Sequence, residues 1–217
     1  MVKRVCLFLL FCIIAFGSAP AIYAQETAAA VPDYKSYLVA KGGVFYPEGN
    51  LSNLNAGFNG ELAYGYRFFR NVAVELSSGY FGATDKPAAG SVLGYPVSVK
   101  ESMYAVPLTV AIKGIVPIDK QFELYGLAGT GAYFVHGSGT ISLAGFSASA
   151  SDNMAVWGGF LGAGVNYNIT SRVFVGLEGK YLWTNTATLR GSIAGVPVSE
   201  NFKIEGILGT ANVGFRF

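Results

Sequence analysis

Apolar residues recur at every second position along most of the chain beyond residue 35. The clearest example has one apolar and aromatic face, made of Phe58, Leu62, Tyr64, Tyr66 and Phe68. The positions between them are polar or small and include Glu61 and Arg67. Successive side chains of a β-strand point to opposite sides, so this pattern predicts strands with one apolar and one polar face.

The same reading predicts eight strands. They span residues 36–46, 57–69, 72–82, 102–116, 122–135, 154–169, 172–184 and 201–217. The last of them places Val213, Phe215 and Phe217 on its apolar face. The segments 36–46 and 122–135 are weaker predictions, because neither of their faces is clearly apolar.

The connections between these segments alternate in length. Short turns are expected at 70–71, 117–121 and 170–171, and long loops at 47–56, 83–101, 136–153 and 185–200. Short turns at one end and long loops at the other are typical of an up-and-down transmembrane β-barrel, which needs an even number of strands. We therefore predict an all-β fold, an eight-stranded antiparallel up-and-down transmembrane β-barrel with four long extracellular loops and short periplasmic turns.

Periodicity alone does not decide which face looks outward, because a soluble lipocalin is an eight-stranded barrel with an apolar interior. Composition favours the membrane barrel. The chain is 52% hydrophobic and only 13% charged, whereas a soluble domain carries about 25% charged residues. Aromatic residues also mark both rims, with Tyr64 and Phe68 at one level and Tyr181 and Trp183 near the other. Interfacial aromatic girdles of this kind favour a lipid-facing outer surface.

The N-terminus has the organisation of a secretory signal peptide. Lys3 and Arg4 precede an apolar run over residues 5–16, which is too short to span a bilayer. We expect residues 1–24 to be cleaved, with cleavage after Ala21 as the alternative. Residues 25–33 would then form a short periplasmic segment, and residues 34–217 the barrel.

Removal of the signal peptide would leave 13 basic and 13 acidic residues, one histidine, and no cysteine, since Cys6 and Cys12 lie within the cleaved part. A neutral chain of this kind argues against a nucleic-acid-binding surface and against a His/Cys zinc site. We expect no cofactor and no metal.

The strand pattern, together with three short runs, resembles a known family. The runs are Gly-Ala-Gly-Val-Asn-Tyr at 162–167, Gly-Leu-Glu-Gly-Lys-Tyr-Leu at 176–182 and Val-Gly-Phe-Arg-Phe at 213–217. They look like the small outer-membrane barrels of Gram-negative bacteria, the OmpA-, OmpX- and opacity-protein-like porin family. The resemblance implies an outer-membrane location, contact with outer-membrane lipids and lipopolysaccharide, and a monomer. It also implies that Val213, Phe215 and Phe217 form the signal read by the barrel-assembly machinery.

Charged residues opposite the apolar faces are candidates for the interior of the barrel, and we also place there Lys41 and Glu123 from the two strands without a clear apolar face. The set has five cations and four anions: Lys41, Glu61, Arg67, Glu75, Lys113, Glu123, Glu178, Lys180 and Arg216. An eight-stranded barrel is just wide enough for side chains to fill it, and buried charges must be paired. The near balance of sign predicts an ion-pair network that plugs the lumen. A polar conduit for water, ions or small solutes is the functional alternative.

Catalysis has one candidate motif. His136 and Ser138 are similar to the His-x-Ser pair of the outer-membrane lipid A deacylases, in which a Glu follows the Ser by about a dozen residues. Residues 144–152 contain no Glu, and Asp152 is their only acid. A catalytic His needs an acidic partner to orient it, so we predict that the protein is not an enzyme. A lipid A-modifying activity remains a remote alternative.

The long loops are then the natural place for function, since exposed loops on a rigid scaffold carry most binding sites. We expect a structural or surface-interaction role of the opacity- or OmpX-like kind, with a surface ligand or host partner bound through the loops. A narrow OmpW-like channel for small solutes is the alternative. Lys203 and Glu205 are expected on the side of the last strand that faces the lipid. Either this part of the strand lies beyond the apolar band of the membrane, or a bulge before Ile207 changes which side chains face outward.

Overall fold

The computed structural model describes the chain from Tyr34 to the C-terminal Phe217. The described ranges are residues 34–52, 54–84, 88–92, 95–143, 146–193 and 196–217, and side chains are described outside 50, 88–92, 95–101, 139–143, 146–152, 187–193 and 196–202. The predicted signal peptide and the segment 25–33 lie outside the described residues.

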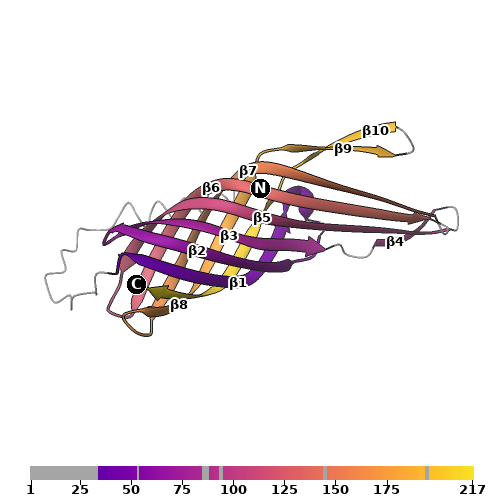
Figure 1. The fold of residues 1–217 in the computed structure, drawn as a ribbon. Helices are drawn as coiled ribbons and strands as arrows, with labels where there is room; N and C mark the ends of the chain where they lie inside the picture. The colour runs from indigo at the N-terminus through magenta and orange to yellow at the C-terminus, as the bar shows by residue number, and fades with distance from the viewer. Residues whose placement is uncertain (1–33, 53, 85–87, 93–94, 144–145, 194–195) are drawn as a thin grey trace. The chain divides into compact units, whose positions relative to one another are not determined.

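Almost every described residue belongs to a β-strand (Figure 1). The elements are β1 (Ser36–Glu48), the short 3-10 helix η1 (Gly49–Leu51), β2 (Gly57–Phe69), β3 (Val72–Thr84), β4 (Ala88–Val92), β5 (Tyr95–Pro117), β6 (Phe122–Leu143), β7 (Phe146–Asn168), β8 (Val173–Thr184), β9 (Ala187–Ile193), β10 (Val196–Phe202) and β11 (Glu205–Arg216). In the part of the chain that the structure covers, no helix is long and apolar enough to cross a bilayer.

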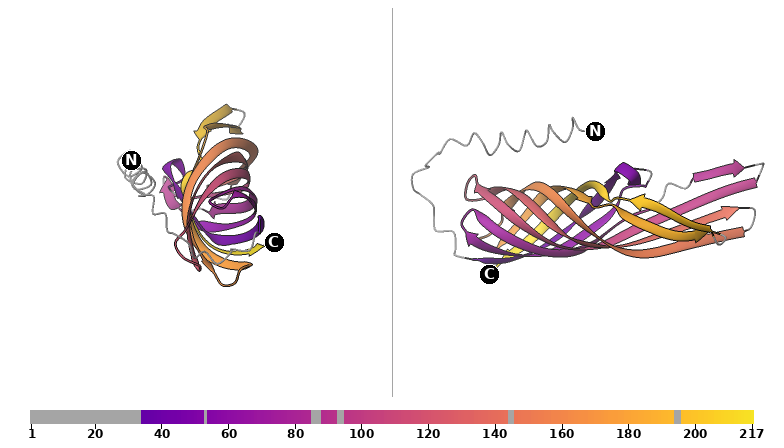
Figure 2. Two further views of the ribbon diagram at one scale, coloured as in Figure 1. Left: turned by 90° about the vertical axis from the view of Figure 1, so that its left-hand side faces the viewer. Right: turned by 90° about the horizontal axis from the view of Figure 1, so that it is seen from above.

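Eight of these strands close into a barrel. The order β3-β2-β1-β11-β8-β7-β6-β5 is antiparallel throughout, and β3 also pairs with β5, which joins the two edges of the sheet. Closure gives every barrel strand two hydrogen-bonded neighbours, which a strand in lipid requires. The strands cross the barrel at a steep tilt (Figure 2). The predicted eight-stranded antiparallel up-and-down barrel is confirmed.

Three of the predicted long loops are in fact built largely of strand. β5, β6 and β7 have 23, 22 and 23 residues and pair in continuous register beyond the other strands. β4 pairs with the outer part of β5, and β9 with β10 forms a separate hairpin. The many Gly, Ser and Ala residues of these segments predict loops. In the structure, antiparallel neighbours provide partners for their backbone hydrogen bonds, so the segments form strands. We call this end of the barrel the hairpin end.

The opposite end is closed by three tight connections and is called the turn end. The turns are residues 70–71, 118–121 and 169–172. Asp119 accepts hydrogen bonds from the backbone N–H groups of Gln121 and Phe122, at 2.7 and 2.6 Å. Thr170 Oγ1 accepts from the N–H of Val173 at 2.9 Å. These short side chains fix their turns by hydrogen-bonding the local backbone.

The outer surface of the barrel is apolar. Leu62, Ile112 and Leu177 are each more than 60% exposed, although such side chains are normally buried in a soluble protein. Aromatic side chains lie outward near both ends, including Phe122 and Tyr167 at the turn end and Tyr80 and Trp183 toward the hairpins. This arrangement suits a surface surrounded by lipid.

Both apolar and charged side chains fill the interior, which explains why the alternation is weak in β1 and β6. β1 turns Tyr37, Val39 and Phe45 inward, and β6 turns Tyr125 and Tyr133 inward. Both faces of these strands are therefore partly apolar, and the clean alternation of apolar and polar positions disappears.

Candidate functional site: the charged interior of the barrel

The nine charged residues predicted for the lumen occupy the interior and pair with one another. They come from seven of the eight barrel strands: Lys41 from β1, Glu61 and Arg67 from β2, Glu75 from β3, Lys113 from β5, Glu123 from β6, Glu178 and Lys180 from β8, and Arg216 from β11. Each has a side chain no more than 14% exposed. The structure divides them into two groups.

Six of them form what we call the central network: Lys41, Glu61, Glu75, Lys113, Glu178 and Lys180. Lys41 lies at its centre, with its Nζ 2.9 Å from Glu178, 3.1 Å from Glu61 and 3.4 Å from Glu75. Lys113 pairs with Glu75 at 2.7 Å, and Lys180 pairs with both Glu61 and Glu178. Three ammonium groups face three carboxylates, so the network is neutral, which burial in a medium of low polarity demands.

Register brings these charges together. Lys41 on β1 stands directly opposite Glu61 on β2, and Glu178 and Lys180 are two positions apart on β8, so both point inward. Glu75 is contributed by β3, on the far side of β2 from Lys41. A long lysine side chain spans that distance, and its three donors can serve three carboxylates at once.

Two tyrosines complete the network, and sequence reasoning missed both. Tyr37 donates to Glu75 at 2.8 Å and Tyr125 donates to Glu178 at 3.0 Å. The Nζ of Lys113 lies 3.8 Å from the centroid of the Tyr125 ring, a cation–π distance. The tyrosines were missed because they lie on the two strands without a clear apolar face.

The other three charges form what we call the turn-end triad: Arg67, Glu123 and Arg216. Glu123 accepts from Arg67 Nη2 at 3.0 Å and from Arg216 Nη2 at 2.9 Å. Arg216 also donates to Asn168 at 2.8 Å and stacks 4.5 Å from the centroid of the Phe174 ring. Arg67 points inward because it continues the alternation that buries Asn59 and Ala63 on β2, and pairing with β3 becomes irregular only beyond Arg67. The triad has two cations for one anion and therefore carries net positive charge.

On the hairpin side of the central network, an apolar plug fills the lumen. It is centred on Phe45, Phe81, Tyr133 and Phe160, all of them buried. Ring centroids of Phe45 and Phe81 are 4.8 Å apart, and those of Phe81 and Tyr133 are 6.3 Å apart. Phe45 is on β1 and Tyr133 is on β6, which are opposite strands of the barrel. The rings therefore reach across the full width of the lumen.

Sequence reasoning did not anticipate this plug, although a signal was present. Phe81 continues the face of β3 that carries Glu75, and Tyr133 continues the face of β6 that carries Glu123. Phe81, a large aromatic residue at the end of a face that carries Glu75 and Ser77, indicated that the interior changes character along the barrel axis.

Some polar atoms in the interior are buried without a protein partner. They are Asn59 Nδ2, Arg67 Nε, Asn166 Oδ1, Asn212 Oδ1 and Arg216 Nε. Buried polar groups are normally hydrogen-bonded, often to ordered water. Four of the five belong to residues near the turn end, so this half of the lumen has the polarity of a hydrated vestibule.

The sequence predicted that His136 begins a long loop, but the structure places it within β6. Its ring stacks on that of Tyr104, with centroids 4.8 Å apart, and its Nδ1 lies 2.6 Å from Asn153 Oδ1. Ser138 Oγ is 2.7 Å from Ser102 Oγ. Both side chains therefore have neutral partners, and the described residues give His136 no acidic one.

The C-terminal residues Val213, Phe215 and Phe217 point outward and are half exposed, with the rings of Phe215 and Phe217 stacked 6.4 Å apart. Pairing of β11 with both its neighbours runs without interruption from Glu205 onward. The alternative of a bulge before Ile207 is therefore wrong. Lys203 is exposed and precedes the strand.

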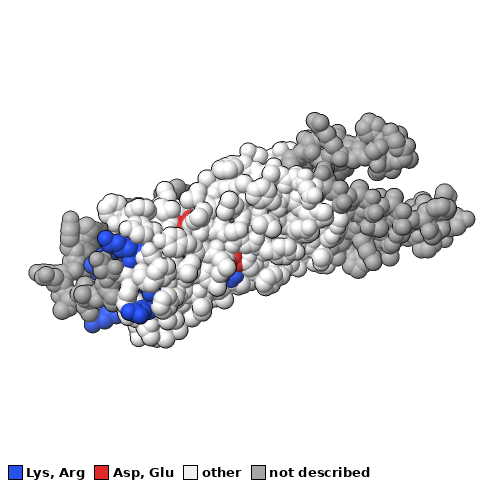
Figure 3. All heavy atoms as spheres, viewed as in Figure 1, with Lys and Arg blue, Asp and Glu red and all other residues white. Residues whose placement is uncertain are grey.

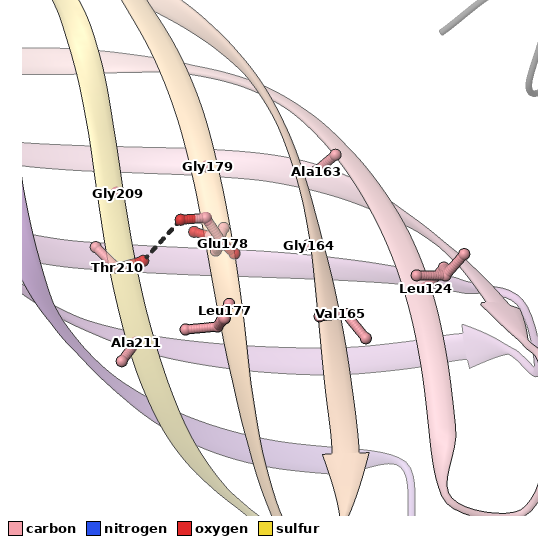
Figure 4. A pocket seen from close by; sticks show the side chains of 10 residues that line it. All are labelled: Leu124, Ala163, Gly164, Val165, Leu177, Glu178, Gly179, Gly209, Thr210 and Ala211. Atoms are coloured by element: carbon pink, nitrogen blue, oxygen red, sulfur yellow. Dashed lines mark hydrogen bonds between the residues drawn. The ribbon is translucent and has the colours of Figure 1, made fainter. Parts of the chain in front are cut away.

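A hollow of about 730 Å³ lies on the outer face of β6, β7, β8 and β11 (Figure 4). Its floor consists of small residues, including Ala163, Gly179 and Gly209. The carboxylate of Glu178, whose backbone also lines the hollow, is turned inward to Lys41. The hollow is thus an uncharged part of the lipid-facing surface. Among the described residues, no group of three or more His, Cys, Asp or Glu side chains could hold a metal ion.

Comparison with known proteins identifies the family. The family model described as "Outer membrane protein beta-barrel domain" matches residues 9–215. A search of curated proteins finds no match.

Solved structures with the same fold come from several bacteria. The outer membrane protein OprG of Pseudomonas aeruginosa is 14% identical, with a TM-score of 0.58 over 85% of this chain and 96% of that one. A major outer membrane protein of Thermus thermophilus is 14% identical, with a TM-score of 0.55 over 84% and 99%. Neisserial surface protein A is 17% identical, with a TM-score of 0.51 over 84% and 97%. At these identities the likeness concerns the fold alone. The match over nearly the whole chain shows that this protein belongs to the outer membrane protein β-barrel family.

Proposed function

We propose that this protein is a closed outer-membrane barrel that displays its long hairpins for surface interaction, in a structural or opacity- and OmpX-like role. In barrels of this class the short turns face the periplasm and the long connections face outward. The turn end would then lie in the periplasm and the hairpin end outside the cell. The Gram-negative outer membrane is the location that the family indicates.

The observation that carries the proposal is the filling of the lumen. The central network joins β1, β2, β3, β5 and β8, and next to it the rings of Phe45, Phe81 and Tyr133 extend from β1 across to β6. Water and ions would have to pass both layers. A lumen filled in this way supports a scaffold role better than a transport role.

The interior also argues against the remote enzymatic alternative. Its carboxylates are engaged by lysines, arginines and tyrosines, whereas the one histidine lies outside the network against Tyr104. A catalytic site needs a nucleophile, a base and an orienting group within hydrogen-bond reach. The described residues offer no such combination around His136.

The second candidate is a narrow channel for small solutes. The unpartnered polar atoms of Arg67, Asn166, Asn212 and Arg216 favour it, because they indicate water in the turn-end half of the lumen. In the closed-barrel proposal this vestibule ends at the central network. A channel would require the network and the plug to open together.

Solute flux into liposomes tests the closed lumen. We expect vesicles containing the mature protein to admit a small sugar no faster than vesicles containing a boiled, unfolded sample. The triple variant Phe45→Ala/Phe81→Ala/Lys41→Met removes two rings of the plug, weakens the central network and serves as an opened control. Rapid flux through the wild-type barrel would favour the channel.

The surface role is tested by removing one hairpin. A variant in which residues 187–202 are replaced by a short Asn-Gly turn should fold as the wild type does, because β9 and β10 pair only with each other. Adhesion to cultured epithelial cells is then compared for bacteria that produce wild type, variant or neither. Equal adhesion by all three would contradict the surface-interaction part of the proposal.

A further inference from the structure

Charge is distributed unequally along the barrel axis. Among the described residues near the turn end, six side chains are cationic and two are anionic: Lys35, Arg67, Arg70, Lys120, Arg172, Arg216, Asp119 and Glu123. The hairpin-side ends of the barrel strands and the sequence segments that connect them have four cations and six anions: Lys86, Lys100, Arg190, Lys203, Glu48, Asp85, Glu101, Asp152, Glu200 and Glu205. The central network between them is neutral.

Four of the turn-end cations are exposed, and we call them the basic rim: Lys35, Arg70, Lys120 and Arg172. Within the described residues none of the four forms an ion pair. The neighbouring anion Asp119 is engaged by backbone N–H groups. Arg172 Nε donates to Tyr34 at 2.8 Å, and its guanidinium lies 5.3 Å from the Tyr34 ring. These contacts orient Arg172 without neutralising it.

The basic rim lies at the level where the apolar surface of the barrel ends. Arg70 directly follows Phe69, which is 73% exposed, and Lys120 lies two residues beyond Ile118, which is 60% exposed. Ile169 precedes Arg172 within the same turn and is exposed too. Apolar side chains of this kind remain in the hydrocarbon, while long cationic side chains reach to the headgroups. The rim therefore stands at headgroup height.

The four cations are spread around the barrel. Lys35 precedes β1, Arg70 joins β2 to β3, Lys120 joins β5 to β6, and Arg172 joins β7 to β8. In the closed strand order these positions fall in four different quarters of the circumference. Figure 3 shows Lys and Arg atoms at this end, whereas the barrel wall that faces the viewer is nearly free of charge.

We propose that the basic rim binds phospholipids with a net negative headgroup in the periplasmic leaflet. Its cations form no ion pair with any described residue, stand at headgroup height and surround the barrel, as the lipids of one leaflet do. A docked protein would favour a patch on one side. Each Lys or Arg close to an anionic membrane surface strengthens binding about fivefold at low salt.

Lipid selectivity measured by electron spin resonance tests the proposal. The refolded mature protein is placed in phosphatidylcholine bilayers with a trace of spin-labelled phosphatidylglycerol or spin-labelled phosphatidylcholine. Wild type should prefer the anionic lipid by about two- to fivefold in 10 mM salt. The preference is no larger because each cation is shared among several of the lipids that surround the barrel. The preference should fall toward one in 500 mM salt, because salt screens exposed charges.

The rim variant carries Lys35→Gln, Arg70→Gln, Lys120→Gln and Arg172→Gln. Its matched control carries Lys86→Gln, Lys100→Gln, Arg190→Gln and Lys203→Gln, which remove the same charge on the hairpin side. We expect the rim variant to lose the preference and the control to keep it. No preference in wild type, or equal loss in both variants, would overturn the proposal.

A smaller variant covers the case in which the quadruple rim variant does not fold. Lys35→Gln with Lys120→Gln leaves the Arg172–Tyr34 contact in place and should lose about half of the preference. An unchanged preference in this folded double variant would also overturn the proposal. Binding of an acidic periplasmic protein by wild type, with no lipid preference, would point to a protein partner instead.

Discussion

Replacement of Lys41 by methionine should destabilise the barrel more than any other single change in the central network. The ammonium group of Lys41 lies within 3.4 Å of three carboxylates, and its side chain is 1% exposed. Methionine has a similar length and no charge, so the change removes the ion pairs while leaving the space largely filled. Three carboxylates would then face only Lys113 and Lys180.

The expected magnitude follows from the charge left behind. Breaking a buried ion pair by removing one partner costs about 3–5 kcal/mol, since an uncompensated charge remains in a medium of low polarity. With a urea dependence of about 2 kcal/mol per molar, a loss of about 4 kcal/mol lowers the unfolding midpoint by about 2 M. That is a large part of the stability of a typical domain.

Urea unfolding in phospholipid vesicles measures this shift. Trp157 and Trp183 lie on the lipid-facing surface, so their fluorescence reports the transfer of the barrel from lipid to water. Lys203→Met is the matched control, because Lys203 is exposed and lies outside the basic rim, so this change should alter the free energy of unfolding by less than about 0.5 kcal/mol. Reversibility is checked by refolding from urea.

A second change should restore part of the loss. Glu178→Gln in the Lys41→Met background returns the network to two cations and two anions, while Glu61 and Glu75 keep Lys180 and Lys113 as partners. The double variant should therefore be more stable than Lys41→Met alone. A midpoint for Lys41→Met within about 0.25 M of wild type at the same urea dependence, equivalent to about 0.5 kcal/mol, would refute this reasoning. A double variant less stable than the single one would also refute it.

Three further predictions concern individual side chains. Tyr125→Phe removes the hydroxyl that donates to Glu178 at 3.0 Å and keeps the ring under Lys113, so urea unfolding should show a loss of about 1.5–3 kcal/mol; an unchanged midpoint would contradict the hydrogen bond. His136→Ala should leave the mass spectrum of lipid A unchanged in producing cells, because His136 stacks on Tyr104; a shifted acylation pattern would revive the enzymatic alternative. Phe217→Ser should reduce assembled protein in cells while refolding in vitro stays normal, as expected of an assembly signal; equal loss in both settings would indicate a purely structural role.

Strand positions were predictable where they depend on local alternation of side chains. Four of the eight barrel strands, β1, β2, β3 and β8, were placed within two residues at each end. The outer parts of β6 and β7 were not, since their many Gly, Ser and Ala residues give no clear alternation of apolar and polar positions, and these parts form strand by pairing with each other. Pairing partners distant in sequence leave no local signal.

The charged interior was partly accessible from the sequence. A charge on the polar face of a strand must point inward in a membrane barrel, so residues such as Lys113 and Glu178 could be assigned to the lumen. Which cation meets which anion depends on strand register and on the closure of β3 against β5. The separation into a neutral network and a positive triad therefore needed the structure.

The apolar plug was not predictable from alternation alone. Alternation assigns one character to the whole inward face of a strand, whereas the interior of this barrel changes from charged to aromatic along its axis. Phe81 and Tyr133 can be assigned to the interior because each lies an even number of residues from an inward charge on its own strand, Glu75 and Glu123. Their meeting with Phe45 across the lumen follows from tilt and register.

Single-channel conductance of the refolded mature protein in a planar bilayer tests the closed lumen most directly. A closed lumen predicts a silent wild-type barrel, shown to be folded by its heat-dependent gel mobility. It predicts stable openings when the plug and the network are both weakened, as in Phe45→Ala/Phe81→Ala/Lys41→Met. Reproducible openings of the wild-type protein, lost when the lumen is filled further, would contradict it and establish the channel.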